Sequence, residues 1–282
     1  MVRGTLRLDT LMMTTIKAQN FLTRIIETKR KRLAQARATR ELTEIRAAAT
    51  DARRTAAPHA LRAALARAGQ LNIIAEIKRA SPSKGELRAE LDAGEVARAY
   101  QVGGATAVSV LTEEDYFRGS LDDLRAVRAG VALPVLRKDF IFDEWQVYEA
   151  AEAGADALLL IVAALDDDSL ARLRGLTEDE LQMDALVEVH TLAELRRAES
   201  CSAQLIGVNN RNLHTFEVNV ETSVELINAR QSRALFVSES GLRTRDDLRR
   251  LRALGFDGFL IGETFMRADD PAAALCALLE QT

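Results

Sequence analysis

Six short apolar segments of this 282-residue chain each end in a residue that can bind a ligand or exchange a proton. The end residues are Lys78, Lys138, Glu188, Asn209, Glu239 and Gly262. Burying an unpaired charge is costly, so charges repeated at the ends of buried strands require partners or a function. Lysines and carboxylates gathered in one place stabilise one another and leave each group able to titrate. The pattern therefore predicts acid–base chemistry in a site lined by strand ends.

The charged residues at these strand ends also carry expectations about protonation. Residues two apart in a strand share a face, so Glu76 and Lys78 should both point into the site. Lys138, next to a second lysine, should have a lowered pKa, whereas Glu188, which follows an apolar pair, should have a raised pKa. A salt-bridge network that merely closes the end of a barrel is the alternative interpretation.

Two glycine-containing turns predict a phosphate site. Ser240-Gly241 follows one apolar segment, and Gly262-Glu263 precedes a short helix-compatible stretch at 265–267. Barrels commonly bind phosphate with the loops after strands 7 and 8, where glycine lets backbone N–H groups approach the anion. Glu263 is expected to contribute its backbone, with its carboxylate turned away. The polar loop Ser81–Gly85 has two interpretations, a loop that closes on the ligand or a plain surface loop.

These residues must be positioned by strands and helices that alternate from Asn72 onward, a pattern typical of a parallel sheet. Strands are expected at 73–78, 107–111, 134–138, 157–162, 185–188, 205–209, 234–239 and 258–262. Helix starts with capping-box spacing are expected at Ser120 with Asp123, Thr191 with Glu194, and Thr244 with Asp247. Helix ends are expected at Gly104, Gly154 and Gly255.

The same three glycines mark a weak internal repeat, with separations of 50 and 101 residues. One strand–helix unit takes about 25 residues, so these separations equal two and four units, and the count closes at eight. The predicted fold is an α/β, (β/α)8 TIM barrel over 72–282, with an N-terminal helical extension over 1–71 packing on it. An open doubly wound sheet is the competing fold, but no G-x-G-x-x-G follows the first strand.

Composition indicates a globular enzyme, with 48% hydrophobic and 28% charged residues. No apolar run approaches the roughly 18 residues of a membrane span. Residues 1–20 lack the apolar core and cleavage site of a signal peptide. Cys201 and Cys276 are far apart and form neither a disulfide framework nor a zinc motif. A cytoplasmic location with no membrane partner is expected.

Charge is unevenly distributed, with 15 Lys/Arg against 5 Asp/Glu in residues 1–71 and 23 against 37 in the remainder. The basic run Lys29–Arg32 could bind nucleic acid. The preferred interpretation is a solvated helix face, because an apolar stripe at helical spacing would lay this helix on the barrel. The stripe consists of Phe21, Leu22, Ile25, Ile26 and Leu33. Helix should continue over 47–66 with a break near Pro58.

One family resembles the chain over the whole predicted barrel. The segment IIAEIKRASPSKG (73–85) is similar to the signature of the indole-3-glycerol phosphate synthases, barrel enzymes of tryptophan biosynthesis. The similarity continues through LTEEDYFRGSLDDL (111–124), PVLRKDFI (134–141), LLLIV (158–162), LVEVH (186–190), GVNNRNL (207–213), VSESGL (237–242) and LIGETFM (260–266). More loosely, ETKRKRLAQAR (27–37) resembles the family's extra helix. Asn212 departs from the family, where an Asp is frequent.

The resemblance implies a substrate, 1-(2-carboxyphenylamino)-1-deoxyribulose 5-phosphate, whose indole ring is closed with loss of carbon dioxide and water. It implies that Lys138 is the general acid of ring closure and that Glu188 is the acid/base partner in dehydration. Lys78 would bind the substrate carboxylate or phosphate and share acid duty. The remaining catalytic shell, which orients the lysines and holds the ribulose hydroxyls, would be Glu76, Asn209 and Glu239.

Binding roles are implied in the same way. Arg211 would position the anthranilate carboxylate, and Phe140 and Leu159 would pack the aromatic ring. Phosphate binding would fall to Lys78, Ser81, Ser240, Gly241, Gly262 and Glu263. No metal or organic cofactor is implied, and the scattered histidines His59, His190 and His214 support none.

Two alternatives stay open at this point. Phosphoribosylanthranilate isomerase shares the fold but relies on a cysteine–aspartate pair, and neither Cys201 nor Cys276 stands at an expected strand end. A nucleic-acid-binding or scaffold role for the basic arm would require affinity that falls steeply with salt. The expected partners are the small-molecule substrate, no nucleic acid and no membrane. A monomer or weak homodimer, with possible contacts to other tryptophan-pathway enzymes, is expected.

Overall fold

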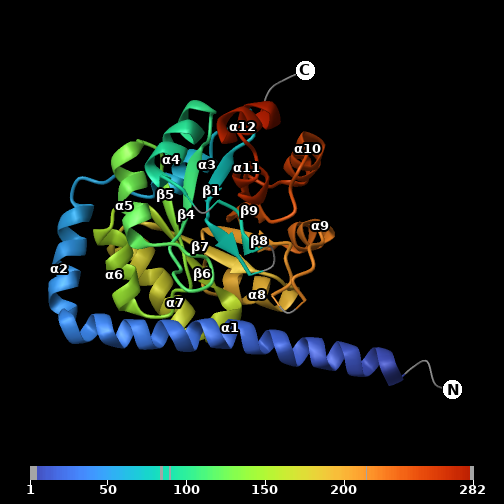
Figure 1. Ribbon diagram of the computed structural model, residues 1–282, viewed down its shortest axis with the longest axis horizontal. Coiled ribbons are helices and arrows are strands. Elements are labelled where there is room, and N and C mark those ends of the chain that lie inside the picture. The colour runs from blue at the N-terminus through green and yellow to red at the C-terminus, as the bar shows by residue number, and fades with distance from the viewer. Residues whose placement is uncertain (1–4, 83–84, 89, 214, 280–282) are drawn as a thin grey trace.

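The computed structural model describes residues 5–82, 85–88, 90–213 and 215–279, and the side chains of the first helix from Phe21 onward. Eight parallel strands of this described chain close into a barrel, in the order β1-β10-β9-β8-β7-β6-β5-β4 (Figure 1). They are β1 (Ile73–Ile77), β4 (Ala107–Leu111), β5 (Val135–Lys138), β6 (Ala157–Ile161), β7 (Asp184–Val189), β8 (Leu205–Asn209), β9 (Leu235–Glu239) and β10 (Gly258–Ile261). The predicted (β/α)8 barrel is therefore confirmed, with each expected strand end within one residue.

Helices follow the strands and cover the outside of the barrel (Figure 1). These helices are α4 (Ala93–Val102), α5 (Leu121–Gly130), α6 (Glu144–Glu152), α7 (Asp167–Gly175), α8 (Leu192–Ser200), α9 (Glu221–Ala229), α10 (Arg245–Leu254), α11 (Glu263–Met266) and α12 (Pro271–Leu279). Shorter elements are the hairpin β2 (Ala80–Ser81) and β3 (Gly85–Glu86), the 3-10 turn η1 (Val162–Ala164) and the π-helical turn η2 (Leu176–Glu180). The short α11 is the helix expected after the last strand.

The barrel interior is a packed apolar core that is closed at one end. Side chains such as Ile74, Leu136 and Leu186 fill it, and Leu61 and Leu65 of α3 (Ala60–Leu65) join the same buried cluster. A second cluster lies between the strands and the outer helices. Since α3 covers the amino-terminal end of the strands, the carboxyl-terminal end is left for ligands, as in other barrels of this type.

Helix termini match the expected positions, but only one of the three expected capping boxes is complete. Thr244 and Asp247 exchange both hydrogen bonds at the start of α10. Ser120 and Thr191 also accept from the expected backbone N–H groups. The paired carboxylates have other partners, however, because Asp123 binds Arg79 and Glu194 binds His190. Gly104, Gly154 and Gly255 have positive φ angles, as expected at helix ends.

The N-terminal helices α1 (Thr5–Thr39) and α2 (Leu42–Arg53) run beneath the barrel and up its side, next to α6 (Figure 1). Ile25 and Ile26 of the expected stripe are buried, and the expected break near Pro58 separates α2 from α3. The prediction of a solvated basic face is wrong in part. Lys29 is only 4% exposed, because it forms ion pairs with the barrel. None of the described helices has the length and apolarity needed to cross a membrane.

Candidate active site

A cavity of about 520 Å³ opens at the carboxyl-terminal end of the strands. Every residue expected in the site lines it: Glu76, Lys78, Ser81, Lys138, Phe140, Leu159, Glu188, Asn209, Arg211, Glu239, Ser240, Gly241, Gly262 and Glu263. The loop after β1 contributes Ser81 and Pro82, while Ser83 and Lys84 of the same loop lie outside the described residues. His214 also lies outside them. The volume suits a ligand of the size of a small phosphosugar derivative.

Lys138 is the centre of the polar floor of this cavity. Its Nζ lies 2.9 Å from Oε2 of Glu188 and 3.0 Å from Oε2 of Glu239. These residues come from β5, β7 and β9, which are alternate strands of the barrel. In such barrels, side chains from alternate strands share one layer, so residues 50 and more apart in sequence meet here.

Glu76 and Lys78 form a second pair beside the first. Lys78 Nζ lies 2.5 Å from Oε1 of Glu76, as expected for residues on one strand face. Glu76 belongs to β1, another alternate strand, and its carboxylate also acts on Lys138. The carboxylates thus stand between the two lysines, and neither lysine has the other as its principal neighbour.

The expected pKa shifts of Lys138 and Glu188 are wrong for this reason. Burial would lower the pKa of Lys138, but the carboxylates of Glu188, Glu239 and Glu76 raise it above its usual value. Burial would raise the pKa of Glu188, but Lys138 and His190 hold it below its usual range. The raised carboxyl is instead Glu239, whose pKa burial brings to about 7 while Lys138 opposes and Glu188 adds to the shift.

Glu239 has the space to remain buried because its neighbour is glycine. A Cβ added to Gly207 of β8 would lie 2.3 Å from Oε1 of Glu239. That oxygen has no hydrogen-bond partner within the described protein, although Glu239 is only 1% exposed. Such an oxygen fits a carboxyl that carries a proton near neutral pH or receives a hydrogen bond from a ligand.

Asn209 and Arg211 continue the site along the loop after β8. Oδ1 of Asn209 accepts a hydrogen bond from the backbone N–H of Arg211 at 3.0 Å. Arg211 donates to the carbonyl of Phe216, and its guanidinium lies 3.8 Å from Glu263. The carboxylate of Glu263 also contacts Arg267 at 3.4 Å. It is therefore engaged by two arginines, which explains how an acidic residue is tolerated at an expected anion site.

Each of the two glycine turns contains a position at which a side chain would be strained or would clash. Gly241 has φ +78, and a Cβ there would lie 2.4 Å from Val218. A Cβ on Gly262 would lie 2.3 Å from Oε1 of Glu76, so this turn passes directly over the Glu76–Lys78 pair. Ser240, with φ +67, adopts the left-handed conformation without being glycine. Both turns border the cavity, as the phosphate prediction requires.

Aromatic and apolar side chains form the rim. Phe117 and Phe140 face each other with ring centroids 6.2 Å apart, and Phe21 of α1 packs edge-on against Phe216 at 5.3 Å. Leu159 lies in the wall. Sequence reasoning placed Phe21 in the helix stripe but missed it as a lining residue, along with Phe117 and Phe216.

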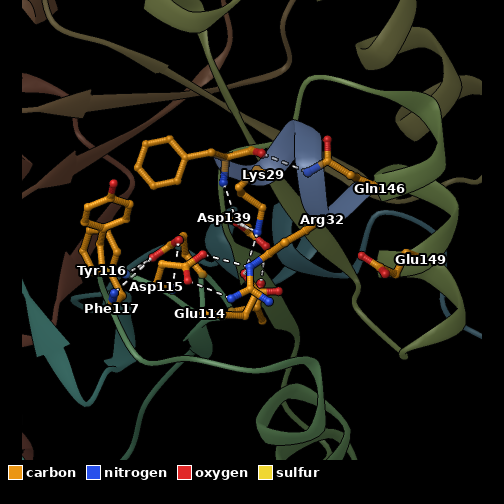
Figure 2. A network of polar contacts seen from close by, with 12 residues as sticks. Lys29, Arg32, Glu114, Asp115, Tyr116, Phe117, Asp139, Gln146 and Glu149 are labelled. Carbon is orange, nitrogen blue, oxygen red and sulfur yellow. Dashed lines mark hydrogen bonds and ion pairs between the residues drawn. The ribbon is translucent and has the colours of Figure 1, made fainter. Parts of the chain in front are cut away.

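The first helix, α1, is joined to the loops around the site by ion pairs (Figure 2). Nζ of Lys29 lies 2.7 Å from Asp139 and 3.2 Å from Glu114, and Arg32 binds Asp115 with two hydrogen bonds. Asp139 directly follows Lys138, and its Oδ1 accepts from the backbone N–H of Phe140. Glu114 and Asp115, two acidic residues of the loop after β4, are thus paired with cations of α1.

A lysine–glutamate cluster at the carboxyl-terminal mouth of a (β/α)8 barrel defines a barrel enzyme equipped for acid–base chemistry. The sequence model of the family described as indole-3-glycerol phosphate synthase matches residues 22–278. The chain belongs to the indole-3-glycerol phosphate synthase family. This agrees with the expectation from the strand-end motifs.

Relatives of the same description are similar over nearly the whole chain. The indole-3-glycerol phosphate synthase of Carboxydothermus hydrogenoformans is 47% identical over 92% of this chain and 99% of its own length. That of Leptothrix cholodnii is 49% identical over 92% of this chain and 98% of its own length. A solved thiamine phosphate pyrophosphorylase from Pyrococcus furiosus shares the fold, with TM-score 0.54 and 18% identity, over 74% of this chain and 93% of its own.

Proposed function

We infer that the residues of this cavity catalyse closure of the indole ring. The protein is a carboxy-lyase of tryptophan biosynthesis that converts 1-(2-carboxyphenylamino)-1-deoxyribulose 5-phosphate to indole-3-glycerol phosphate. The observation that carries the assignment is family membership over residues 22–278, in a chain whose expected site residues all line one cavity. The reaction needs a proton donor at the ribulose carbonyl, cations for the substrate's anionic groups and a proton acceptor for dehydration.

Lys138 serves as the general acid of ring closure in this proposal. Its raised pKa keeps it protonated before reaction, and the alkoxide that forms at the ribulose carbonyl is basic enough to take the proton. The carboxylates of Glu188 and Glu239, within 3.0 Å of Nζ, hold the ammonium in place. They also stabilise the cation until the proton moves.

Glu188 serves as the acid/base partner in dehydration, and begins as a base because it is ionised in the resting site. Glu188 accepts a proton from the closed ring as the hydroxyl leaves, and a protonated neighbour donates the proton that converts this hydroxyl to water. Lys78 shares that acid duty and binds the substrate's carboxylate or phosphate. Glu239, with its pKa near 7, can also hold a proton at neutral pH. Glu76 and Asn209 orient this set.

Binding is divided between two sides of the cavity. The phosphate is held by Lys78 and by backbone or hydroxyl donors of Ser81, Ser240, Gly241, Gly262 and Glu263. The aromatic ring packs against Phe140 and Leu159, and Arg211 faces the anthranilate carboxylate. The strand order supports this division, because the glycine turns follow β9 and β10, whereas Phe140 and Leu159 belong to β5 and β6 or the loop after them, across the barrel.

The competing functions lose their support in the described site. An isomerase would require a cysteine, but Cys201 follows α8 and Cys276 lies on α12, and neither is among the lining residues. Nucleic-acid binding would require a free basic arm. Lys29 and Arg32 are instead paired with acidic residues of the barrel loops.

We also propose that residues 1–71 act as a helical extension of a catalytic barrel formed by 72–282. The ion pairs and apolar stripe of α1 support this division. The proposal also includes a cytoplasmic location, a monomeric or weakly dimeric state, and contacts with other enzymes of the tryptophan pathway. Size-exclusion chromatography with light scattering at several protein concentrations tests the oligomeric state.

The test of the function is direct. Purified protein is incubated with 1-(2-carboxyphenylamino)-1-deoxyribulose 5-phosphate while indole fluorescence is followed. Appearance of the indole signal with one carbon dioxide released per product is the expected result. Absence of indole, with the substrate recovered unchanged, would refute the assignment.

A further inference from the structure

His190 stands behind the catalytic carboxylate Glu188, outside the described lining of the cavity. It follows β7 two residues after Glu188, and so shares that residue's strand face. Its Nε2 lies 3.3 Å from Oε1 of Glu188, at the distance of an ion pair without the alignment of a hydrogen bond. Glu188 is thus held between two nitrogens, because Lys138 contacts its other oxygen at 2.9 Å.

Glu194 of α8 fixes the ring from the far side. Its Oε2 lies 3.3 Å from Nδ1 of His190 and also accepts the backbone N–H of His190 at 2.6 Å. Thr191 caps the backbone N–H of Glu194, which anchors this carboxylate at the helix start. Each ring nitrogen therefore faces a carboxylate, and only an imidazolium presents an N–H to both.

The surrounding charges favour that state. Burial would lower the pKa of His190, but Glu188 and Glu194 raise it to about 9. The two arginines of α8 have other partners, since Arg197 binds Asp167 and the carbonyls of Val162 and Leu165, and Arg196 binds Glu199. The segment η1, which packs against α8, carries no charged residue.

His190 also balances the charge of the site. In the described cluster, Lys78 and Lys138 interact with three carboxylates, those of Glu76, Glu188 and Glu239. A further cation beside this cluster favours the ionisation of more than two of these carboxylates at once. The imidazolium supplies it at the oxygen of Glu188 that Lys138 does not reach.

We propose that His190 is a positioning residue for the reaction, whose imidazolium, oriented by Glu194, holds Glu188 ionised and turned toward Lys138. The proposal rests on the proposed role of Glu188 as the base of dehydration. It assigns no contact between His190 and substrate. Loss of the imidazole should therefore change the protonation of Glu188 and leave substrate binding nearly intact.

The pH dependence of kcat tests this role in His190→Gln, which retains an amide donor without the charge. A cation beside a carboxylate lowers its pKa by about 1–3 units, so the acidic limb of kcat should move up by that amount. Turnover on the plateau and KM should change little. His59→Gln is the matched control, because His59 lies at the opposite end of β7, beside Asp184. The acidic limb of kcat in His59→Gln should stay at the wild-type pH.

A uniform loss of kcat at every pH, or an unmoved limb, would overturn the proposal. Glu194→Gln is an independent variant, in which the acidic limb of kcat should move in the same direction by a smaller amount. If wild-type protein makes no indole product at all, the proposed function fails, and a second measurement still tests the ring itself.

Imidazole NMR supplies that measurement, since the chain contains only three histidines. The His190 resonances, assigned by their loss in His190→Gln, should report an imidazolium that titrates near pH 9. Glu188→Gln should lower that midpoint. A neutral His190 ring at pH 7 in the wild type would contradict the proposal, whatever the activity.

Discussion

Replacing Lys138 by methionine removes an ammonium that contacts both Glu188 and Glu239, and keeps the volume of the aliphatic chain. A positioned general acid contributes about 10²–10⁴ in rate, so kcat should fall by that factor, or about 3–5 kcal/mol in activation free energy. Substrate affinity should change by less than about tenfold, because Lys78 and the phosphate turns remain. Steady-state kinetics and equilibrium binding separate the two effects.

The same change should alter protonation in the resting site. Without Lys138, the carboxylates of Glu188 and Glu239 lose their shared cation, and their mutual repulsion raises one pKa. Glu239, with its pKa of about 7, is already partly protonated at pH 7 in the wild type. The infrared band of a protonated carboxylic acid should therefore be stronger at pH 7 in Lys138→Met than in the wild type, and it should weaken on adding Glu239→Gln.

Lys31→Met is the control, since Lys31 is exposed on α1 and should behave as the wild type. Near-normal turnover of Lys138→Met would remove Lys138 from the acid role. A large loss of substrate affinity with unchanged kcat would make Lys138 a substrate-binding residue instead.

Two further predictions concern stability. Lys29→Met removes the partner of Asp139 at 2.7 Å, while Arg137 and Thr112 remain bound to that carboxylate. The loss should cost roughly 2 kcal/mol in urea unfolding, with Lys31→Met unchanged. Equal midpoints would show that the pair contributes nothing. Raised folded pKa values at Glu239, from 4.5 to about 7, and His190, from 6.5 to about 9, mean that the folded state binds more protons than the unfolded state. The free energy of unfolding should therefore fall as pH rises, by up to about 3 kcal/mol between pH 4.5 and 7 for Glu239 and between pH 6.5 and 9 for His190. Glu239→Gln and His190→Gln should each show no such fall in the matching pH range. A wild-type fall in either variant would contradict the assignment to that residue.

The sequence was sufficient to predict the strands and the residues that line one cavity at their ends. Each apolar run is the length of a buried strand, and the polar residue at its end marks where the strand meets solvent. Because parallel strands of a barrel end on one side, Lys138, Glu188 and Glu239 could be assigned to one mouth without knowing their distances.

The pairing within that mouth could not be predicted. Lys78 was expected beside Lys138, but it turns to Glu76 on its own strand. Alternate strands bring Lys138 to Glu188 and Glu239 instead. Layering depends on strand tilt and register, which the sequence pattern does not specify, and the sign of each pKa shift depends on that layering.

The packing of the first helix on the barrel was expected, but the ion pairs of its basic run could not be predicted, for a similar reason. A run such as Lys29–Arg32 has the same pattern whether it faces water or acidic loops. Its partners Glu114 and Asp139 lie 85 and more residues away in the chain. Helical spacing indicates which residues share a face, but not which surface that face meets.

The most direct test of the central claim, that Lys138 acts before Glu188 in closing and dehydrating the indole ring, is rapid-quench analysis of single turnovers. Glu188→Gln should accumulate a ring-closed, undehydrated intermediate and release little indole product, whereas Lys138→Ala should leave the substrate open. If Glu188→Gln accumulates only unchanged substrate, Glu188 acts at ring closure and the proposed order of steps is wrong.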